Sequence, residues 1–119
     1  MSEKNIKELF QQRVTLTTLT SDDSGDTTVL GDFDQQMKVL HFTFAAGLSI
    51  THTIKLPPIG RHAGQSIMIY LISKSTGSKL QIVDEAGTSV DSADLDADGD
   101  CAIYTCTGQN WKETYDGIA

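Results

Sequence analysis

The densest group of candidate metal ligands in this chain is the run Asp-Leu-Asp-Ala-Asp-Gly-Asp at residues 94–100. Alternating carboxylates followed by a glycine are similar to the first half of an EF-hand calcium loop. That loop also requires a bidentate glutamate at its twelfth position and a helix on either side. Here Thr105 stands at the twelfth position, and a β-rich run follows the aspartates. We therefore predict a turn shaped by Asp and Gly residues, with a weak surface calcium site as the alternative.

Three histidines, His41, His52 and His62, are further candidates for metal ligands or general bases. If residues 38–56 form a β-hairpin, the register that matches its apolar faces points His52 into the core beside Leu40. The same register points His41 outwards, and His62 lies in a loop flanked by glycines. We therefore predict three unrelated histidines, with no metal site and no cofactor.

Sequence motifs that activate a nucleophile are absent. The chain has no Gly-x-Ser-x-Gly, no His-Glu-x-x-His and no glycine-rich phosphate loop before a helix. A glycosidase needs two carboxyl groups in different environments across a cleft, whereas the carboxylates here fall in predicted turns. We predict that the protein is not an enzyme. The rival hypothesis, a small hydrolase or metal-dependent enzyme, requires titratable groups clustered in a pocket.

Aromatic side chains could instead line a carbohydrate or protein site, and the candidates are Trp111, Tyr104, Tyr115 and Phe42. A single tryptophan after a Gly-Gln-Asn turn more often packs over the end of a sandwich. We therefore predict a packing role for Trp111, and glycan binding is the alternative.

The two cysteines, Cys101 and Cys106, lie on one predicted strand. Their odd separation places the side chains on opposite faces of a strand, too far apart for a disulfide. We interpret both as small packing residues in a reduced compartment.

Size and charge narrow the class of protein. A chain of 119 residues suits one domain with a hydrophobic core. Its net charge is −7, and residues 84–100 carry seven carboxylates without a Lys or Arg. This acidic strip repels phosphate, so we expect no direct nucleic-acid binding and predict that the strip faces solvent.

No apolar stretch is long enough to span a membrane, and residues 1–7 precede no signal-like apolar segment, so synthesis in a cytoplasm is expected.

Short β-rich runs separated by Gly and Asp turns predict an all-β chain, as an antiparallel β-sandwich or jelly-roll-like barrel. We expect residues 13–119 to form a single β-sandwich domain, and residues 1–12 to form a short helix or an arm that orders on a partner. Residues 67–72 are apolar on both pleat faces, so that strand is central or lies at a subunit interface. The expected strands are residues 14–19, 27–30, 65–73, 80–83 and 101–106.

The register of the predicted hairpin at residues 38–56 follows from its buried faces. The inward residues are expected to be Leu40, Phe42 and Phe44 on one arm and Leu48, Ile50, His52, Ile54 and Leu56 on the other. A three-residue loop at 45–47 pairs Phe44 with Leu48, so that apolar residues oppose each other. It also places Gly47 at the left-handed position that such loops favour. A two-residue turn would mismatch the faces.

Residues 54–111 contain an ordered series of short motifs. A Leu-Pro-Pro entry leads through glycine into an apolar strand, and a polar turn, an Ile-Val strand, an Ala-Asp-Gly-Asp step and a Gly-x-x-Trp strand follow. This order resembles that of bacteriophage virion proteins, namely head decoration (cement) proteins and tail-fibre or tail-spike modules. Cys101 and Cys106 depart from an oxidised, disulfide-stapled virion protein. The matching pieces are residues 56–58, 64–72, 80–87, 97–100 and 108–111.

The resemblance implies a structural virion protein, made in the host cytoplasm and displayed on the capsid surface. The small size favours a decoration protein, which would bind the outer capsid surface as a homotrimer and bridge subunits of the major capsid protein through many weak contacts. The alternative is a tail-fibre or tail-spike module that binds a receptor or glycan through Trp111, Tyr104 and Tyr115. The expected capsid or subunit contacts are Ile6, Leu9 and Phe10 in the arm, and Pro57, Pro58, Ile59, Arg61 and His62 in a rim.

Overall fold

The computed structural model describes residues 14–19, 27–47, 49–74, 77–91 and 93–118, and these form strands joined by turns and one short 3₁₀ turn. The predicted all-β class is confirmed, and the expected strands are all present. The elements are β1 (Val14–Leu19), β2 (Thr27–Val29), β3 (Met37–Phe44), β4 (Thr51–Lys55), η1 (Ile59–Arg61), β5 (Ser66–Ser73), β6 (Lys79–Val83), β7 (Cys101–Cys106) and β8 (Trp111–Gly117).

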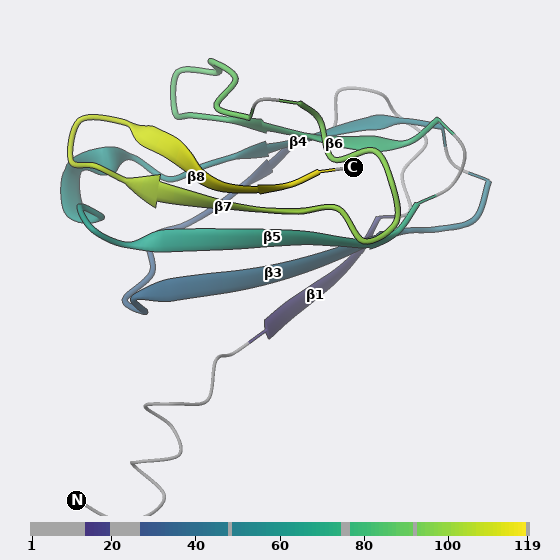
Figure 1. Cartoon of the computed structure of the whole chain (residues 1–119), viewed down its shortest axis with the longest axis horizontal. Helices are drawn as coiled ribbons and strands as arrows, with labels where there is room; N and C mark the ends of the chain where they lie inside the picture. The colour runs from purple at the N-terminus through teal and green to yellow at the C-terminus, as the bar shows by residue number, and fades with distance from the viewer. Residues whose placement is uncertain (1–13, 20–26, 48, 75–76, 92, 119) are drawn as a thin grey trace, which may run out of the picture.

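The strands form two sheets, and the chain alternates between them. Sheet A is 5-stranded with the order β1-β3-β5-β7-β8, and sheet B is 3-stranded with the order β2-β4-β6. The pairs β1–β3, β3–β5, β2–β4 and β4–β6 are parallel. Figure 1 shows β1, β3, β5 and β7 side by side, with β4 and β6 in a second layer. The chain from β1 to β6 therefore winds as a coil, and the predicted antiparallel pairing is wrong for these strands.

The predicted hairpin at residues 38–56 is also wrong. Strand β3 belongs to sheet A and β4 to sheet B, so the two arms do not pair with each other. Phe42 instead pairs with Thr17 and Leu71 of the neighbouring parallel strands. Gly47 does adopt a positive φ of 85°, and it lies in the turn that takes the chain from one sheet to the other.

Both sheets contribute to one hydrophobic core. On β3 the side chains of Leu40, Phe42 and Phe44 point into it, and on β4 His52 and Ile54 do so. The predicted inward faces of both arms are therefore correct, although their pairing is not. The core cluster includes Leu19, Leu30, Phe33, Ile50, Leu56, Ile67, Ile69, Leu71, Leu80, Ile82, Leu95, Ala102, Tyr104, Cys106 and Trp111.

Strands β7 and β8 complete sheet A by antiparallel pairing, β7 with β5 and β8 with β7. Strand β5 is consequently the central strand of sheet A, as predicted. Its inward residues Ile67, Ile69 and Leu71 are buried, whereas its outward side is only partly covered by the described part of the chain. The predicted cover on both pleat faces is thus seen on one.

The predicted arm at residues 1–12, with Ile6, Leu9 and Phe10, lies outside the described residues. In the described ranges, no helix has the length and apolar character that a membrane crossing requires.

Candidate functional site

The connection between β4 and β5, residues 56–65, forms an exposed loop on a buried base, and we call it the rim loop. Pro58 and Arg61 are exposed and Ile59 is half-buried. Pro57 and His62 are buried, and His62 has a relative exposure of 0%. The predicted rim residues are thus divided between a surface and the base that holds it.

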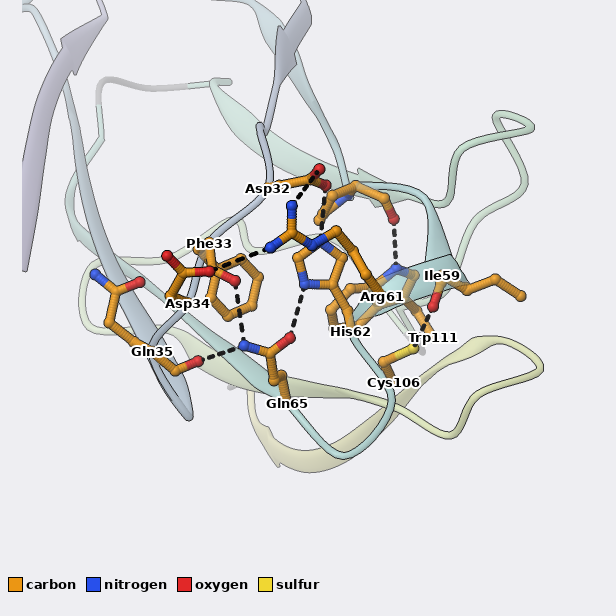
Figure 2. A network of polar contacts seen from close by, with 11 residues as sticks. Asp32, Phe33, Asp34, Gln35, Ile59, Arg61, His62, Gln65, Cys106 and Trp111 are labelled. Atoms are coloured by element: carbon orange, nitrogen blue, oxygen red, sulfur yellow. Dashed lines mark hydrogen bonds and ion pairs between the residues drawn. The ribbon is translucent and has the colours of Figure 1, made fainter.

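His62 forms hydrogen bonds through both ring nitrogens. Its Nδ1 lies 2.8 Å from Gln65 Oε1, and its Nε2 lies 2.8 Å from Asp32 Oδ1. The ring is drawn between these two side chains in Figure 2, with Arg61 passing beside it. Asp32 comes from the segment after β2, so the contact joins two successive turns of the coil.

The orientation of Gln65 determines which atom faces the imidazole. Gln65 Nε2 donates hydrogen bonds to the backbone oxygens of Phe33 and Gln35, at 3.2 and 2.8 Å. Its Oε1 is therefore the acceptor that faces His62, and Asp32 presents a second acceptor. Both ring nitrogens are therefore taken up by hydrogen bonds within the protein, and the ring itself is fully buried.

Asp32 and Arg61 extend the network to the surface. Arg61 lies 3.5 Å from Asp32 and 3.3 Å from Asp34. The hydrogen bond from His62 is the main cause that lowers the pKa of Asp32, with a smaller contribution from the charge of Arg61 against an opposing desolvation effect. Asp32 therefore stays ionised, and it holds both a buried ring and an exposed guanidinium.

Aromatic packing and backbone bonds fix the base of the rim loop. The ring of Phe33 stacks on His62 with centroids 4.8 Å apart and an interplanar angle of 17°. Trp111 lies on β8 with its ring 6.2 Å from that of His62, and its Nε1 donates to Pro57 O at 2.7 Å. The Gly64 amide donates to the Cys106 carbonyl on β7 at 2.8 Å. The loop is therefore anchored to three parts of the fold.

The sequence indicates a loop at residues 57–62 but not the contacts that anchor it. Asp32, Gln65 and Trp111 come from separate segments, and nothing in the spacing of these residues links them to His62. A pair of acidic residues before β3 and a histidine between glycines are common features of turns. Only the parallel stacking of the coil brings them together.

The acidic run at residues 94–100 forms the predicted turn. Asp98 Oδ1 accepts the Lys74 amide at 2.8 Å, and Asp100 Oδ2 accepts the amides of Asp96 and Ala97 at 3.0 Å. Asp94 lies 3.0 Å from the ammonium of Lys79. Within the described ranges, no three His, Cys, Asp or Glu side chains are grouped to hold a metal ion.

The predicted solvent exposure of the acidic strip holds for part of it. Glu85, Asp96 and Asp98 are exposed, whereas Asp100 has a relative exposure of only 2%. Burial of Asp100 follows from its capping role, because its carboxylate satisfies amides inside the turn.

The remaining candidate residues lie in separate places. His41 lies outside the core with its ring 5.1 Å from that of Tyr70, and His52 Nε2 lies 2.7 Å from Thr28 Oγ1 inside it. Cys101 and Cys106 are both free thiols, with Cys106 buried. Trp111 and Tyr104 are buried while Tyr115 is exposed, so the three aromatics expected for a glycan site do not share a surface.

Comparison with protein-family models, with curated proteins and with solved structures gives no match for this chain. The structure itself defines the class of protein as a coiled all-β scaffold that carries an anchored surface loop. Its function is inferred from the rim loop and the residues that hold it.

Proposed function

We propose that this protein is a structural component of a bacteriophage virion, of the capsid decoration (cement) type. It binds the outer capsid surface as an oligomer and bridges subunits of the major capsid protein. The resemblance to decoration proteins implies that this oligomer is a homotrimer. The function requires no cofactor and no chemical step. Synthesis takes place in the host cytoplasm, and the protein then joins the assembled shell.

The observation that carries this proposal is the fixed conformation of the rim loop. Pro58, Ile59 and Arg61 are presented on a base held by buried His62 and by the Trp111 bond to Pro57. A loop that is already ordered loses little conformational entropy when it binds. The anchored loop therefore favours a docking role for its exposed residues.

The charged and apolar residues of the rim loop indicate what kind of partner surface it can bind. Arg61 is exposed but already lies near the carboxylates of Asp32 and Asp34. Pro58 and Ile59 beside one oriented guanidinium form a partly apolar patch, which suits a partner protein surface that is itself partly apolar and partly polar. The arm residues Ile6, Leu9 and Phe10 are proposed as a second contact with the shell.

Co-sedimentation with purified shells that lack the protein tests this proposal. We expect Arg61→Ala to weaken shell binding about tenfold, equivalent to about 1.4 kcal/mol. Lys112→Ala removes an exposed cation on β8 and serves as the matched control. Deletion of residues 1–12 tests the arm in the same assay. Unchanged occupancy for both the Arg61 variant and the deletion would contradict the proposed contacts.

A tail-fibre or tail-spike module is the second candidate, because successive strands stack in parallel as in β-solenoids. Burial of Trp111 and Tyr104 removes two of the aromatic residues that glycan binding was expected to use. Binding to isolated tails and a positive glycan array would support the tail role. Binding to shells with a silent array would support decoration.

A further inference from the structure

The outer side of sheet A, facing away from the core, carries two rows of side chains that cross its strands. The register aligns Val39 of β3 with Met68 of β5, Ile103 of β7 and Tyr115 of β8. The next outward row contains Leu16, His41, Tyr70 and Cys101. We call these two rows the outer face of sheet A.

Apolar residues on this face are only partly covered by the described part of the chain. Leu16 at one edge has a relative exposure of 62%, and Tyr115 at the other edge has 52%. Met68 and Ile103 between them are half-buried. Val39 is buried but does not belong to the core cluster, because its neighbours are on the outer face. A continuous apolar row over adjacent strands marks an interaction surface more often than scattered apolar residues do.

Charge is absent from the same rows. Neither row contains an Asp, Glu, Lys or Arg residue, although the whole chain is 21% charged. The hydroxyl groups next to the rows are paired with each other: Ser66 with Thr105 at 2.8 Å, and Thr105 with Thr114 at 2.9 Å. The two rows are therefore apolar at their centre, as the centre of a protein interface is, and Lys112, the register partner of Thr105, is an exposed cation at this margin.

Sheet B has a different outer side. Its outward positions include Thr53 paired with Gln81, and Lys55, which lies between Val83 and the exposed Val29. Lys79 also lies there and forms its ion pair with Asp94. Polar and charged side chains of this kind are typical of a solvated sheet face. This contrast makes the outer face of sheet A the better candidate for burial against a partner.

We propose that the outer face of sheet A binds a second copy of this chain. Two copies with a net charge of −7 each repel one another at most surfaces. The two rows of the outer face contain no carboxylates. Two copies can therefore bind through these rows without bringing like charges together. The same absence of charge gives the face nothing to pair with a strongly cationic partner. This inference rests on the oligomer of the proposed function and deepens it by naming the surface through which the copies bind, whereas shell binding is assigned to the rim loop.

Light scattering on a sizing column measures the mass of the full chain and tests the inference. The wild type is expected to exceed the monomer mass of 12.9 kDa. Met68→Glu, which places a charge in the middle of the face, is expected to return the protein to that monomer mass. Thr53→Glu places the same charge on the outer side of sheet B and should leave the mass unchanged. Met68→Leu should also leave it unchanged, and circular dichroism verifies that each variant is folded.

Labelling of Cys101 by a maleimide gives an independent readout, because its thiol lies on the face while Cys106 is buried. We expect slow labelling in the wild type and in Thr53→Glu, and fast labelling in Met68→Glu. A wild-type protein of monomer mass overturns the inference. If Cys101 of that monomer is labelled slowly, the face is covered by another part of the same chain. An oligomer that survives Met68→Glu overturns it as well.

Shell binding distinguishes this inference from the proposed function. A monomer that binds shells contradicts self-association through sheet A and the proposed homotrimer, and it leaves shell binding through the rim loop intact. An oligomer that is dissociated by Met68→Glu but fails to bind shells supports the inference and contradicts decoration.

Discussion

The Nε2 atom of His62 lies 2.8 Å from Asp32 Oδ1, although the two residues are separated by 30 positions in the chain. This contact joins the segment after β2 to the rim loop after β4, and it places an ionised carboxylate against a fully buried ring. Such a bond between successive turns of the coil should make stability depend on pH.

We predict that Asp32→Asn removes part of the acid sensitivity of folding. His62 holds the pKa of Asp32 below its ordinary value of 3.8, so the carboxylate binds protons more weakly in the folded state than in the unfolded state. Its stabilisation is therefore present above the unfolded pKa and is lost as the pH falls through the folded value. Urea unfolding midpoints between about pH 2 and pH 6 should decline less steeply for the variant than for the wild type.

Asp34→Asn is the matched control for that experiment. Asp34 contacts Arg61 at the surface, and no bond to His62 involves it. Exposed ion pairs of this kind contribute little to stability, so the control should follow the wild-type curve. Equal slopes for wild type and Asp32→Asn would contradict the role assigned to the buried bond.

Replacement of His62 by alanine should lower the free energy of unfolding by about 2–4 kcal/mol. The change leaves a cavity between Phe33 and Trp111 and removes a partner from Gln65. Trp111 is the only tryptophan, so its fluorescence reports unfolding near the mutated position. Gln81→Ala on the outer side of sheet B should cost under about 1 kcal/mol. A His62 variant as stable as the Gln81 variant would show that the network does not anchor the loop.

Much of the fold could be predicted from the sequence, because alternation of apolar residues identifies strands and their buried faces. Leu40, Phe42 and Phe44 point into the core as expected, and so do His52 and Ile54. Alternation has the same period of two in parallel and antiparallel sheets. It therefore could not show that Phe42 pairs with Thr17 and Leu71 in a parallel sheet and that β4 joins the other sheet.

The site could be predicted only in part, for a related reason. Pro58 and Arg61 were recognisable as loop residues from the prolines and glycines around them. Burial of His62 depends on Phe33 and Asp32 from the preceding turn of the coil and on Trp111 from β8. These contacts arise from tertiary structure, and local residue types do not encode them.

Trp111→Phe should destabilise the protein by about 1–2 kcal/mol. The substitution keeps an aromatic ring in the core but removes the indole donor of the 2.7 Å bond to the Pro57 carbonyl. Because the bond is buried, that oxygen would lose its partner without gaining water. Unfolding is followed by circular dichroism, since the variant lacks tryptophan. Tyr115→Phe, on an exposed ring, should change the stability by less than about 0.5 kcal/mol, and an equal loss in both variants would contradict this assignment.

Calcium should neither bind to nor stabilise the turn at residues 94–100. Asp98 and Asp100 already accept backbone amides, and Asp94 is paired with Lys79. A calcium ion would have to displace these donors and find ligands that the turn does not group together. Titration calorimetry at millimolar calcium should give no saturable heat, and the melting temperature should not change. Saturable heat that Asp98→Asn abolishes would show that the turn is a calcium site.

Tyr104→Phe should raise the free energy of unfolding by about 1 kcal/mol or leave it unchanged. The Tyr104 hydroxyl is buried and has no hydrogen-bond partner among the described residues. Desolvation raises the pKa of this phenol, so it stays neutral and its O–H remains a donor that must be buried. Phenylalanine keeps the ring packing on β7 and removes the unpaired group. Tyr70→Phe on the outer face of sheet A is the control for loss of a tyrosine hydroxyl. A loss of stability in the Tyr104 variant alone would mean that an ordered water satisfies the hydroxyl in the core.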